Sequence, residues 1–271
     1  MKIATYNVNS VNARIESLCD WLVQEKPDVV LLQEIKCEFN AFPFFEINAA
    51  GYDAKILGQK SYNGVAILSR HKIKVVQENL PNFEDENARY LEAVVQINNK
   101  PLRIASLYLP NGTPPQNNPS DMSKFEYKLK WMDAFICQTE KLLHQPEPVI
   151  LGGDFNIILT DKDVYNPEAF RGGALYRPEV INRLQTILYQ GWSDAFRLCQ
   201  IKSSALTTKK ENGYTYWDYG GGAFMGDLGL RIDYMLLSPK AADLLEKCWV
   251  DKQPRRTSKP SDHAPLIAEL N

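Results

Sequence analysis

The chain has 271 residues, of which 44% are hydrophobic and 24% are charged, and its formal net charge is −2. This length suits one large α/β or all-β domain with a sizeable core, and the near-neutral total provides no global basic field of the kind that marks many nucleic-acid-binding proteins. Five widely spaced cysteines without a Cys-x-x-Cys pair exclude a disulfide framework or a structural zinc site as the basis of the fold.

The first elements predicted in chain order are a strand, a helix and a strand. Residues 2–9 alternate, so that Asn7 and Asn9 point to the same side of a strand. Helical spacing follows over residues 15–22, and a proline breaks it before the apolar run 29–32, which is typical of a buried strand.

Six further strands are predicted after this opening, at residues 64–68, 90–97, 102–109, 149–151, 232–237 and 265–270. A meander among them is typical of antiparallel pairing. Because the opening strand-helix-strand unit favours parallel pairing, the sheets are predicted to be mixed.

Two amphipathic helices are predicted in the second half of the chain. Residues 123–126 fit a helix capping box, and apolar residues at helical spacing continue to residue 143. The second helix is predicted to begin at Pro178 and to end before Gly191. Little periodicity is visible between these helices or over residues 202–229, and such stretches are more often functional surface loops than linkers. No boundary divides the chain, so one domain is expected over residues 1–271.

Strand-like runs from both ends and the middle of the chain stop at acids, amides or a histidine. The terminal residues are Asn7, Glu34, Asp154 with Asn156, Asp233, and the adjacent pair Asp262 and His263. Such a set predicts one acidic site at the strand ends of a sheet-based domain, suited to a divalent cation and a phosphate. Hard oxygen ligands such as Glu34 and Asp262 suit Mg²⁺, and the amide of Asn7 completes a shell without adding charge.

The same residue types match the needs of phosphodiester hydrolysis. The reaction requires cationic shielding, a base for the attacking water, and donors for the charge that develops on the transition-state oxygens. Asp154 is suited to take or orient the proton of that water, with Asn156 on the same strand face holding it in place. His263 can donate to a phosphate oxygen, and a carboxylate such as Asp233 would fix its tautomer and favour its charged form.

Each element also has an ordinary structural explanation. Gly-Asp-x-Asn is a common turn, a lone histidine is more often solvated or in a core than catalytic, and Glu34 can simply end a strand. Asn7 can satisfy backbone groups at a sheet edge. Five such coincidences together are much rarer than any one of them, which favours a single functional site.

Eight short motifs carry these residues in order along the whole chain. They are Tyr6-Asn7-Val8-Asn9, Leu32-Gln33-Glu34-Ile35-Lys36, Asn63-Gly64-Val65-Ala66, Tyr108-Leu109-Pro110-Asn111-Gly112, Gly153-Asp154-Phe155-Asn156, Tyr216-Trp217-Asp218-Tyr219, Gly229-Leu230-Arg231-Ile232-Asp233-Tyr234 and Lys259-Pro260-Ser261-Asp262-His263-Ala264-Pro265. The chain resembles bacterial exonuclease III and related abasic-site endonucleases of the endonuclease/exonuclease/phosphatase superfamily, and the last three motifs are specific to this branch.

The resemblance implies a four-layer α/β sandwich, in which two mixed β-sheets pack face to face and are flanked by helices. It implies a Mg²⁺- or Mn²⁺-dependent DNA repair nuclease. Such an enzyme incises double-stranded DNA on the 5′ side of an abasic site, leaves a 3′-hydroxyl, and also degrades or trims 3′ ends.

The resemblance also assigns the metal site. Glu34 is expected to be the principal metal ligand, with Asn7 and Asp262 nearby. Asn9 is an Asp in some eukaryotic relatives, so the site is expected to follow the bacterial pattern with one acid fewer.

Catalytic roles follow from the same resemblance. Asp154 is expected to handle the nucleophilic water and Asn156 to orient it, while Asp233 and His263 form a hydrogen-bonded pair facing the phosphate. Tyr108 is expected to bond the scissile phosphate or to assist the leaving oxygen. Whether Asp154 or His263 is the general base stays open.

Substrate contacts are expected in the loops. The positions that match an apolar pocket for a flipped-out, baseless sugar are Tyr216, Trp217, Leu230 and Ile232, although these residues also suit an ordinary core. The matching DNA-contact positions are Tyr62, Arg89 and Asn111. A local basic track is predicted from Lys36, Arg70, Lys72, Lys124 and Lys128. Gly220-Gly221-Gly222 replaces the bulky residues that some relatives insert into the DNA helix.

Two alternatives stay open. One is another phosphoesterase of the superfamily, either a non-specific nuclease or a small-molecule phosphatase, although the phosphatase branch carries Cys-Asp-Arg where Ile232-Asp233-Tyr234 stands here. The other is a catalytically silent DNA-binding homologue, whose expected mark is the loss of Glu34, Asp154 or His263. We expect a cytoplasmic protein, nucleoid-associated if bacterial, that binds no membrane and needs no obligate protein partner.

Overall fold

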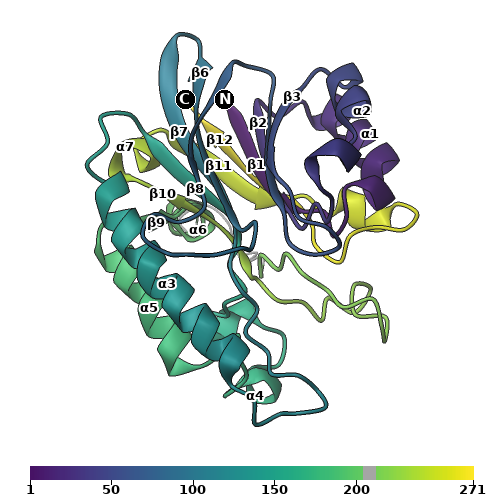
Figure 1. The fold of residues 1–271 in the computed structure, drawn as a ribbon, viewed down its shortest axis with the longest axis vertical. Helices are drawn as coiled ribbons and strands as arrows, with labels where there is room; N and C mark the ends of the chain where they lie inside the picture. The colour runs from purple at the N-terminus through teal and green to yellow at the C-terminus, as the bar shows by residue number, and fades with distance from the viewer. Residues whose placement is uncertain (204–211) are drawn as a thin grey trace.

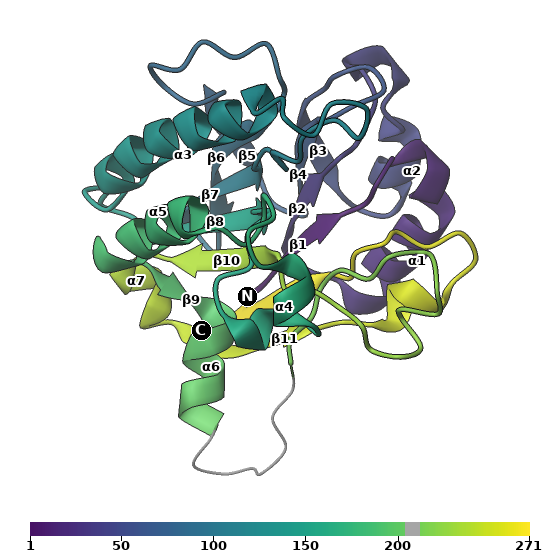
Figure 2. The ribbon, with the colours of Figure 1, turned by 90° about the horizontal axis from the view of Figure 1, so that it is seen from below.

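A computed structural model describes residues 1–203 and 212–271, and its strands form two mixed sheets that pack face to face. Helices cover the outer faces of both sheets (Figure 1, Figure 2). The four-layer α/β sandwich expected from the sequence is therefore confirmed. Part of the aperiodic segment expected at 202–229 lies outside the described residues.

Each sheet has six strands within the described residues. The order in the first sheet is β11 (Leu245–Val250), β12 (Leu266–Leu270), β1 (Lys2–Asn7), β2 (Val29–Gln33), β4 (Val65–Ser69) and β3 (Asp53–Leu57). The order in the second is β5 (Ile73–Glu78), β6 (Tyr90–Ile97), β7 (Lys100–Tyr108), β8 (Val149–Asp154), β10 (Asp233–Leu237) and β9 (Ser193–Asp194).

Both sheets contain a parallel pair at their centre. Strand β1 runs parallel to β2 and antiparallel to β12, and strand β7 runs parallel to β8, which is antiparallel to β10. In this register Asn7 lies opposite Gln33, and Asp154 lies opposite Asp233. The mixed pairing predicted from the sequence is confirmed.

The described helices surround the two sheets. Their bounds are α1 (Ile15–Glu25), α2 (Phe44–Ala49), α3 (Ser123–Leu142), α4 (Pro167–Phe170), α5 (Pro178–Tyr189), α6 (Ala195–Ser203) and α7 (Pro239–Ala242), with short 3-10 turns at Asn12–Arg14, Phe39–Ala41, Asp161–Asp163 and Gln253–Arg256. Helices α1 and α2 lie against the first sheet, and α3 and α5 lie against the second (Figure 1). No helix in the described part of the chain is long and apolar enough to cross a membrane.

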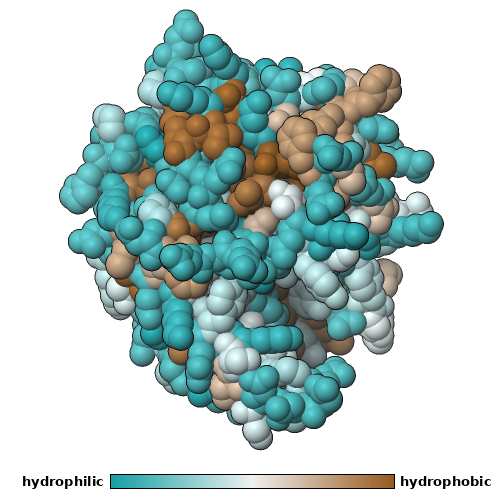
Figure 3. Space-filling view, viewed as in Figure 1, coloured by the Kyte–Doolittle hydropathy of each residue, from teal (hydrophilic) through white to brown (hydrophobic). Residues whose placement is uncertain are grey.

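Alternation along the strands divides the core into layers. Ile3 contributes to the layer between the sheets, whereas Ala4 packs toward α1. Glycine is required where β7 and β8 run side by side: a Cβ on Gly153 would lie 1.9 Å from the carbonyl oxygen of Leu107. The face seen in Figure 3 is mostly hydrophilic, with apolar side chains gathered in its upper part.

One predicted local feature is wrong. The predicted capping box makes Ser123 the N-cap, but Ser123 is the first residue of α3, its N-cap is Met122, and no side chain caps the helix. The carboxylate of Asp121 instead accepts a hydrogen bond of 2.9 Å from the backbone N–H of Ser123. An Asp two residues upstream therefore replaces the expected capping box.

Candidate active site

The strand-end residues of the two sheets meet through the side chain of Asn7. Its Nδ2 donates to Glu34 Oε1 at 2.8 Å and to Asp154 Oδ2 at 2.9 Å. Asn7 ends β1 in one sheet and Asp154 ends β8 in the other, so one amide bridges the sandwich. Glu34 follows β2 with a φ of 50°, a left-handed conformation that turns the chain out of the strand.

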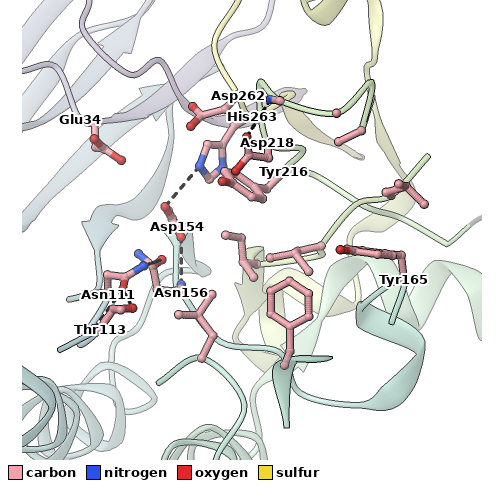
Figure 4. A pocket seen from close by; sticks show the side chains of 18 of the residues that line it. Glu34, Asn111, Thr113, Asp154, Asn156, Tyr165, Tyr216, Asp218, Asp262 and His263 are labelled. Atoms are coloured by element: carbon pink, nitrogen blue, oxygen red, sulfur yellow. Dashed lines mark hydrogen bonds and ion pairs between the residues drawn. The ribbon is translucent and has the colours of Figure 1, made fainter. Parts of the chain in front are cut away.

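A second hydrogen bond joins Asp233, at the start of β10, to His263 near the end of the chain. Asp233 Oδ2 lies 2.8 Å from His263 Nδ1. His263 Nε2 lies 3.7 Å from Asp154 Oδ2, and the dashed line between these two residues in Figure 4 marks this contact. All three side chains are buried. Burial disfavours the imidazolium, but the carboxylates of Asp233 and Asp154 outweigh it and raise the pKa of His263 above its ordinary value. Burial also raises the pKa of Asp154.

Glu34 is held in its ionised form. Burial opposes ionisation, yet hydrogen bonds from Asn7 and Lys36 lower the pKa of this carboxyl below its ordinary value. Lys36 Nζ lies 2.7 Å from Glu34 Oε2 and also donates to Asn9 Oδ1. Asn9 Nδ2 in turn donates to Asp262 Oδ1 at 3.0 Å. Asn9 and Lys36 therefore connect Glu34 to Asp262, a linking role that the sequence analysis did not assign to either residue.

These side chains fit a divalent cation. Among the described residues, one ligand atom from each of Glu34, Asp154 and His263 lies within 4.8 Å of the others. Carboxylate and amide oxygens dominate the surroundings, which suits a hard cation. The ring of His263 is already oriented by Asp233, so oxygen atoms are better donors for such a cation than the imidazole.

Asn156 is held by its neighbours on both sides. Its backbone N–H donates to Asp154 Oδ1 at 2.9 Å, and its side chain donates to Leu109 O at 3.0 Å. Asn111 Nδ2 donates to Asn156 Oδ1 at 3.0 Å. The structure thus brings Asn156 against Asp154 through the main chain, while its amide ties the segment after β7 to the segment after β8.

Tyr108 faces the acids from the end of β7. Burial first, and then the negative charges of Glu34 and Asp154, raise the pKa of its phenol well above the ordinary value, so the hydroxyl keeps its proton. The guanidinium of Arg89 stacks 4.9 Å from the centre of the Tyr108 ring. Tyr62 lies between β3 and β4, and 71% of its surface is exposed, so a bound substrate can contact it.

A cavity of about 640 Å³ opens beside this cluster. Its polar end includes Glu34, Asp154, Asp262, His263, Tyr108 and Asn111, and its apolar end includes Tyr165, Phe170, Leu175, Tyr216, Leu228, Leu230 and Ile232. The ring of Tyr216 meets the ring of His263 edge-on at 5.0 Å between centroids. Figure 4 shows the acidic side chains at one end of the cavity and Tyr165 at the other.

Trp217 does not line this cavity, in contrast to its three companions in the predicted pocket. It is fully buried and packs edge-on against Phe224 at 5.2 Å. Its Nε1 donates to Asp227 Oδ1 at 3.3 Å. Alternation explains the difference, because neighbouring residues in an extended segment point to opposite sides, and Tyr216 takes the cavity side.

Sequence reasoning missed the part of the apolar wall that follows β8. Tyr165, Phe170 and Leu175 come from the segment around α4, between β8 and α5. The only signal for them was the expectation of a functional loop between the two long helices. No periodicity marks such residues, because the chain around α4 is irregular.

The predicted basic track is wrong at three positions. Lys128 is completely buried. Arg70 and Lys72 follow the end of β4 that pairs with the beginning of β2, whereas Glu34 follows the end of β2. These two residues therefore lie at the opposite end of the sheet from the acids.

The fold and the site together define a hydrolase built on two facing mixed sheets, with acids and an Asp-His pair at the strand ends. The chain belongs to the Endonuclease/Exonuclease/phosphatase family, whose model matches residues 4–263. The family is divalent-metal dependent, in agreement with the acidic cluster.

Individual relatives extend over the whole chain. Exodeoxyribonuclease III of Haemophilus influenzae is 30% identical over 277 residues, with 100% of both chains covered. The structure of an AP endonuclease from Archaeoglobus fulgidus superposes with a TM-score of 0.88 at 30% identity, covering 100% of this chain and 99% of the other. The 3′ phosphatase NExo from Neisseria, bound to a product DNA hairpin, gives a TM-score of 0.87 at 33% identity, with 100% and 99% covered.

Proposed function

We infer that the protein is a DNA repair nuclease that incises double-stranded DNA 5′ to abasic sites, leaving a 3′-hydroxyl, and that it also removes nucleotides or blocking groups from 3′ ends. The observation that carries this inference is one cavity with two ends. Its polar end holds the acids and His263, and its apolar end is walled by Tyr216, Leu230 and Ile232. The names and activities of the relatives point in the same direction.

Mg²⁺ is the proposed cofactor, with Mn²⁺ as a substitute. Glu34 and Asn7 would hold it. Asp262 would lie nearby, because Asn9 and Lys36 link its carboxylate to that of Glu34. The ion would supply positive charge beside the scissile phosphate and displace the ammonium of Lys36 from Glu34. The oxygen-rich donor set is the physical reason for preferring Mg²⁺ over softer cations.

His263 is proposed to be the proton-bearing donor to a phosphate oxygen. Its Nδ1 is engaged by Asp233 at 2.8 Å, which leaves Nε2 to face Asp154 and the cavity. Two flanking carboxylates stabilise the imidazolium, and a charged donor binds an anionic transition state more strongly than a neutral one.

Asp154 is then the better candidate for the group that takes the proton of the attacking water. The backbone N–H of Asn156 and the amide of Asn7 fix its two oxygens, one each. Burial raises its pKa toward the range in which a carboxylate acts well as a general base near neutral pH. Tyr108, which retains its proton, is placed to donate to the phosphate or to the leaving oxygen.

The apolar end of the cavity is proposed to receive a sugar that has rotated out of the duplex. A deoxyribose without its base presents an apolar ring face, which Leu230 and Ile232 can cover. Tyr62, Arg89 and Asn111 are proposed to contact the DNA backbone outside this pocket. Residues 1–271 would then act as one domain, because the site draws on Asn7 and His263 alike.

The direct test uses two labelled duplexes, one with a single abasic-site analogue and one with a recessed 3′ end. Each is incubated with the protein in Mg²⁺ and in chelator. Metal-dependent incision immediately 5′ to the analogue is the expected result, and degradation of the recessed strand ranks the second activity. A folded protein that cuts neither duplex in Mg²⁺ or Mn²⁺ would refute the proposed function.

A further inference from the structure

The side chain of Lys128 is buried, although it was expected on the surface. It belongs to the first half of α3, and none of its surface is exposed. Its Nζ donates to three backbone carbonyls, of Asn156 at 2.7 Å and of Asn111 and Ala174 at 3.0 Å each. An ammonium has three hydrogens, so each one finds an acceptor.

The three carbonyls come from three different segments around the cavity. Asn111 follows β7 and Asn156 follows β8, whereas Ala174 lies between α4 and α5. Asn111 and Asn156 line the cavity directly, and Ala174 immediately precedes Leu175 of its apolar wall. The side chain of Lys128 therefore connects, from the protein interior, segments of both the polar and the apolar wall of the cavity.

The stem of the lysine is also part of this support. Gly112 adopts a φ of +79°, and a Cβ on this residue would lie 2.7 Å from Lys128 Cδ and 3.2 Å from its Cβ. The segment after β7 thus rests directly on the lysine, and only glycine permits that approach. Burial lowers the pKa of Lys128 to about 7 although the charge of Asp154 raises it. A charge placed where water cannot solvate it depends on its three carbonyl partners.

We propose that Lys128 is a positioning residue of the nuclease, whose ammonium fixes the segments carrying Asn111, Asn156 and Leu175 relative to Asp154. The expected effect on kcat rests on the proposed function. The expected effect on the three segments does not, because their amide hydrogen exchange can be measured without substrate. Small displacements of groups around a reaction centre lower rates far more than they lower affinity.

The principal variant is Lys128→Met, which keeps an unbranched apolar stem and removes all three donors. We expect kcat on the abasic duplex to fall about 10- to 100-fold, with KM changed less than about threefold because exposed groups elsewhere contact the DNA. Lys130→Met is the matched control, since Lys130 is exposed on the same helix, and it should behave as wild type. Lys128→Met with wild-type kcat would overturn the proposal.

Amide hydrogen exchange supplies the readout that is independent of activity. In Lys128→Met, exchange should accelerate in residues 109–113 and 172–176 and stay unchanged in the strands of the first sheet. A lower kcat with unchanged exchange in those two segments would show that Lys128 does not position them. If the wild-type protein cuts neither duplex, the proposed function fails, and accelerated exchange alone still decides the structural claim.

A charge-specific rescue separates positioning by the ammonium from simple filling of space. Lys128→Ala should regain at least about fivefold in kcat with millimolar propylamine and nothing with propanol, because only the amine restores the donors. Equal rescue by both additives, or by neither, would overturn the role of the charge. Should Lys128→Met not fold, Gly112→Ala offers the second test: it pushes the segment off the lysine stem, and unchanged exchange at 109–113 would contradict the inference.

Discussion

Asp233→Asn tests whether His263 needs the negative charge of Asp233 or only a side chain of the same shape. The substituted amide keeps an oxygen that can accept from His263 Nδ1, which lies 2.8 Å from Asp233 Oδ2 in the structure, but it removes the negative charge. Hydrogen bonds to charged groups are worth about 1.5–3 kcal/mol, and both side chains are almost fully buried. Because each 1.36 kcal/mol changes a rate tenfold, a loss of about 3 kcal/mol predicts a kcat about 150-fold lower.

The expected loss depends on pH. Burial lowers the pKa of His263, and Asp233 is the largest of the influences that raise it. Without that carboxylate the imidazolium loses its proton at a lower pH, so the deficit of the variant should be larger at pH 9 than at pH 6. In the wild type the charged form persists as pH rises until the raised pKa is reached.

Single-turnover cleavage of the abasic duplex at pH 6, 7.5 and 9, in saturating Mg²⁺, measures both effects. Asp243→Asn is the control, because this exposed acid lies beyond the far end of β10. A wild-type rate in Asp233→Asn, or the same deficit at pH 6 and pH 9, would refute the reasoning that His263 acts as a charged donor.

Three further outcomes are expected. Glu34→Ala should raise the Mg²⁺ concentration for half-maximal activity at least about tenfold, and an unchanged metal titration would place the ion elsewhere. Leu230→Asp should lower abasic-site incision more than 3′-exonuclease activity, and an equal fall would mean that the apolar wall does not hold the sugar. Asp163→Asn should lower the free energy of unfolding at pH 7 by about 3 kcal/mol, because it leaves Arg231 buried without this partner. Burial opposes the ionisation of Asp163, but Arg231 outweighs it and lowers the pKa. The stabilisation is therefore fully present above about pH 4, the ordinary pKa of a carboxyl group. It should be lost as the pH falls through the lowered pKa that Asp163 has in the folded protein. Urea unfolding at pH 7 and at pH 3 measures this loss.

Residues at strand ends were the most predictable part of the site. Asn7, Glu34 and Asp154 end runs whose apolar character is visible in the sequence, and the geometry of facing sheets brings such ends together. The partner of His263 was predictable for the same reason, since Asp233 begins a buried strand. Residue types suggested roles for Asp154, Asp233 and His263, and the resemblance to a known family added the role of Tyr108.

Side-chain direction was much harder to predict. Trp217 and Tyr216 are adjacent aromatic residues, and only the backbone decides which one faces the cavity. Lys128 is expected in solvent from its residue type, yet it lies at helical spacing from Phe125 and Met132 on the buried face of α3, where three backbone carbonyls accept from its ammonium. Helical spacing places the residue on that face, but the three acceptors that make its burial tolerable come from tertiary contacts.

The place of β12 has a consequence for folding. This strand inserts between β1 and β11, pairing Lys2 with Glu269 near the two ends of the chain, and Figure 1 shows the termini close together. Closing such a long loop is entropically costly, so contacts of this kind form slowly. The strand also follows directly on His263, which therefore reaches Asp233 only when the sheet is completed. Incompletely folded molecules would then lack the Asp233–His263 pair, so catalytic competence would arise only in the step that completes the first sheet.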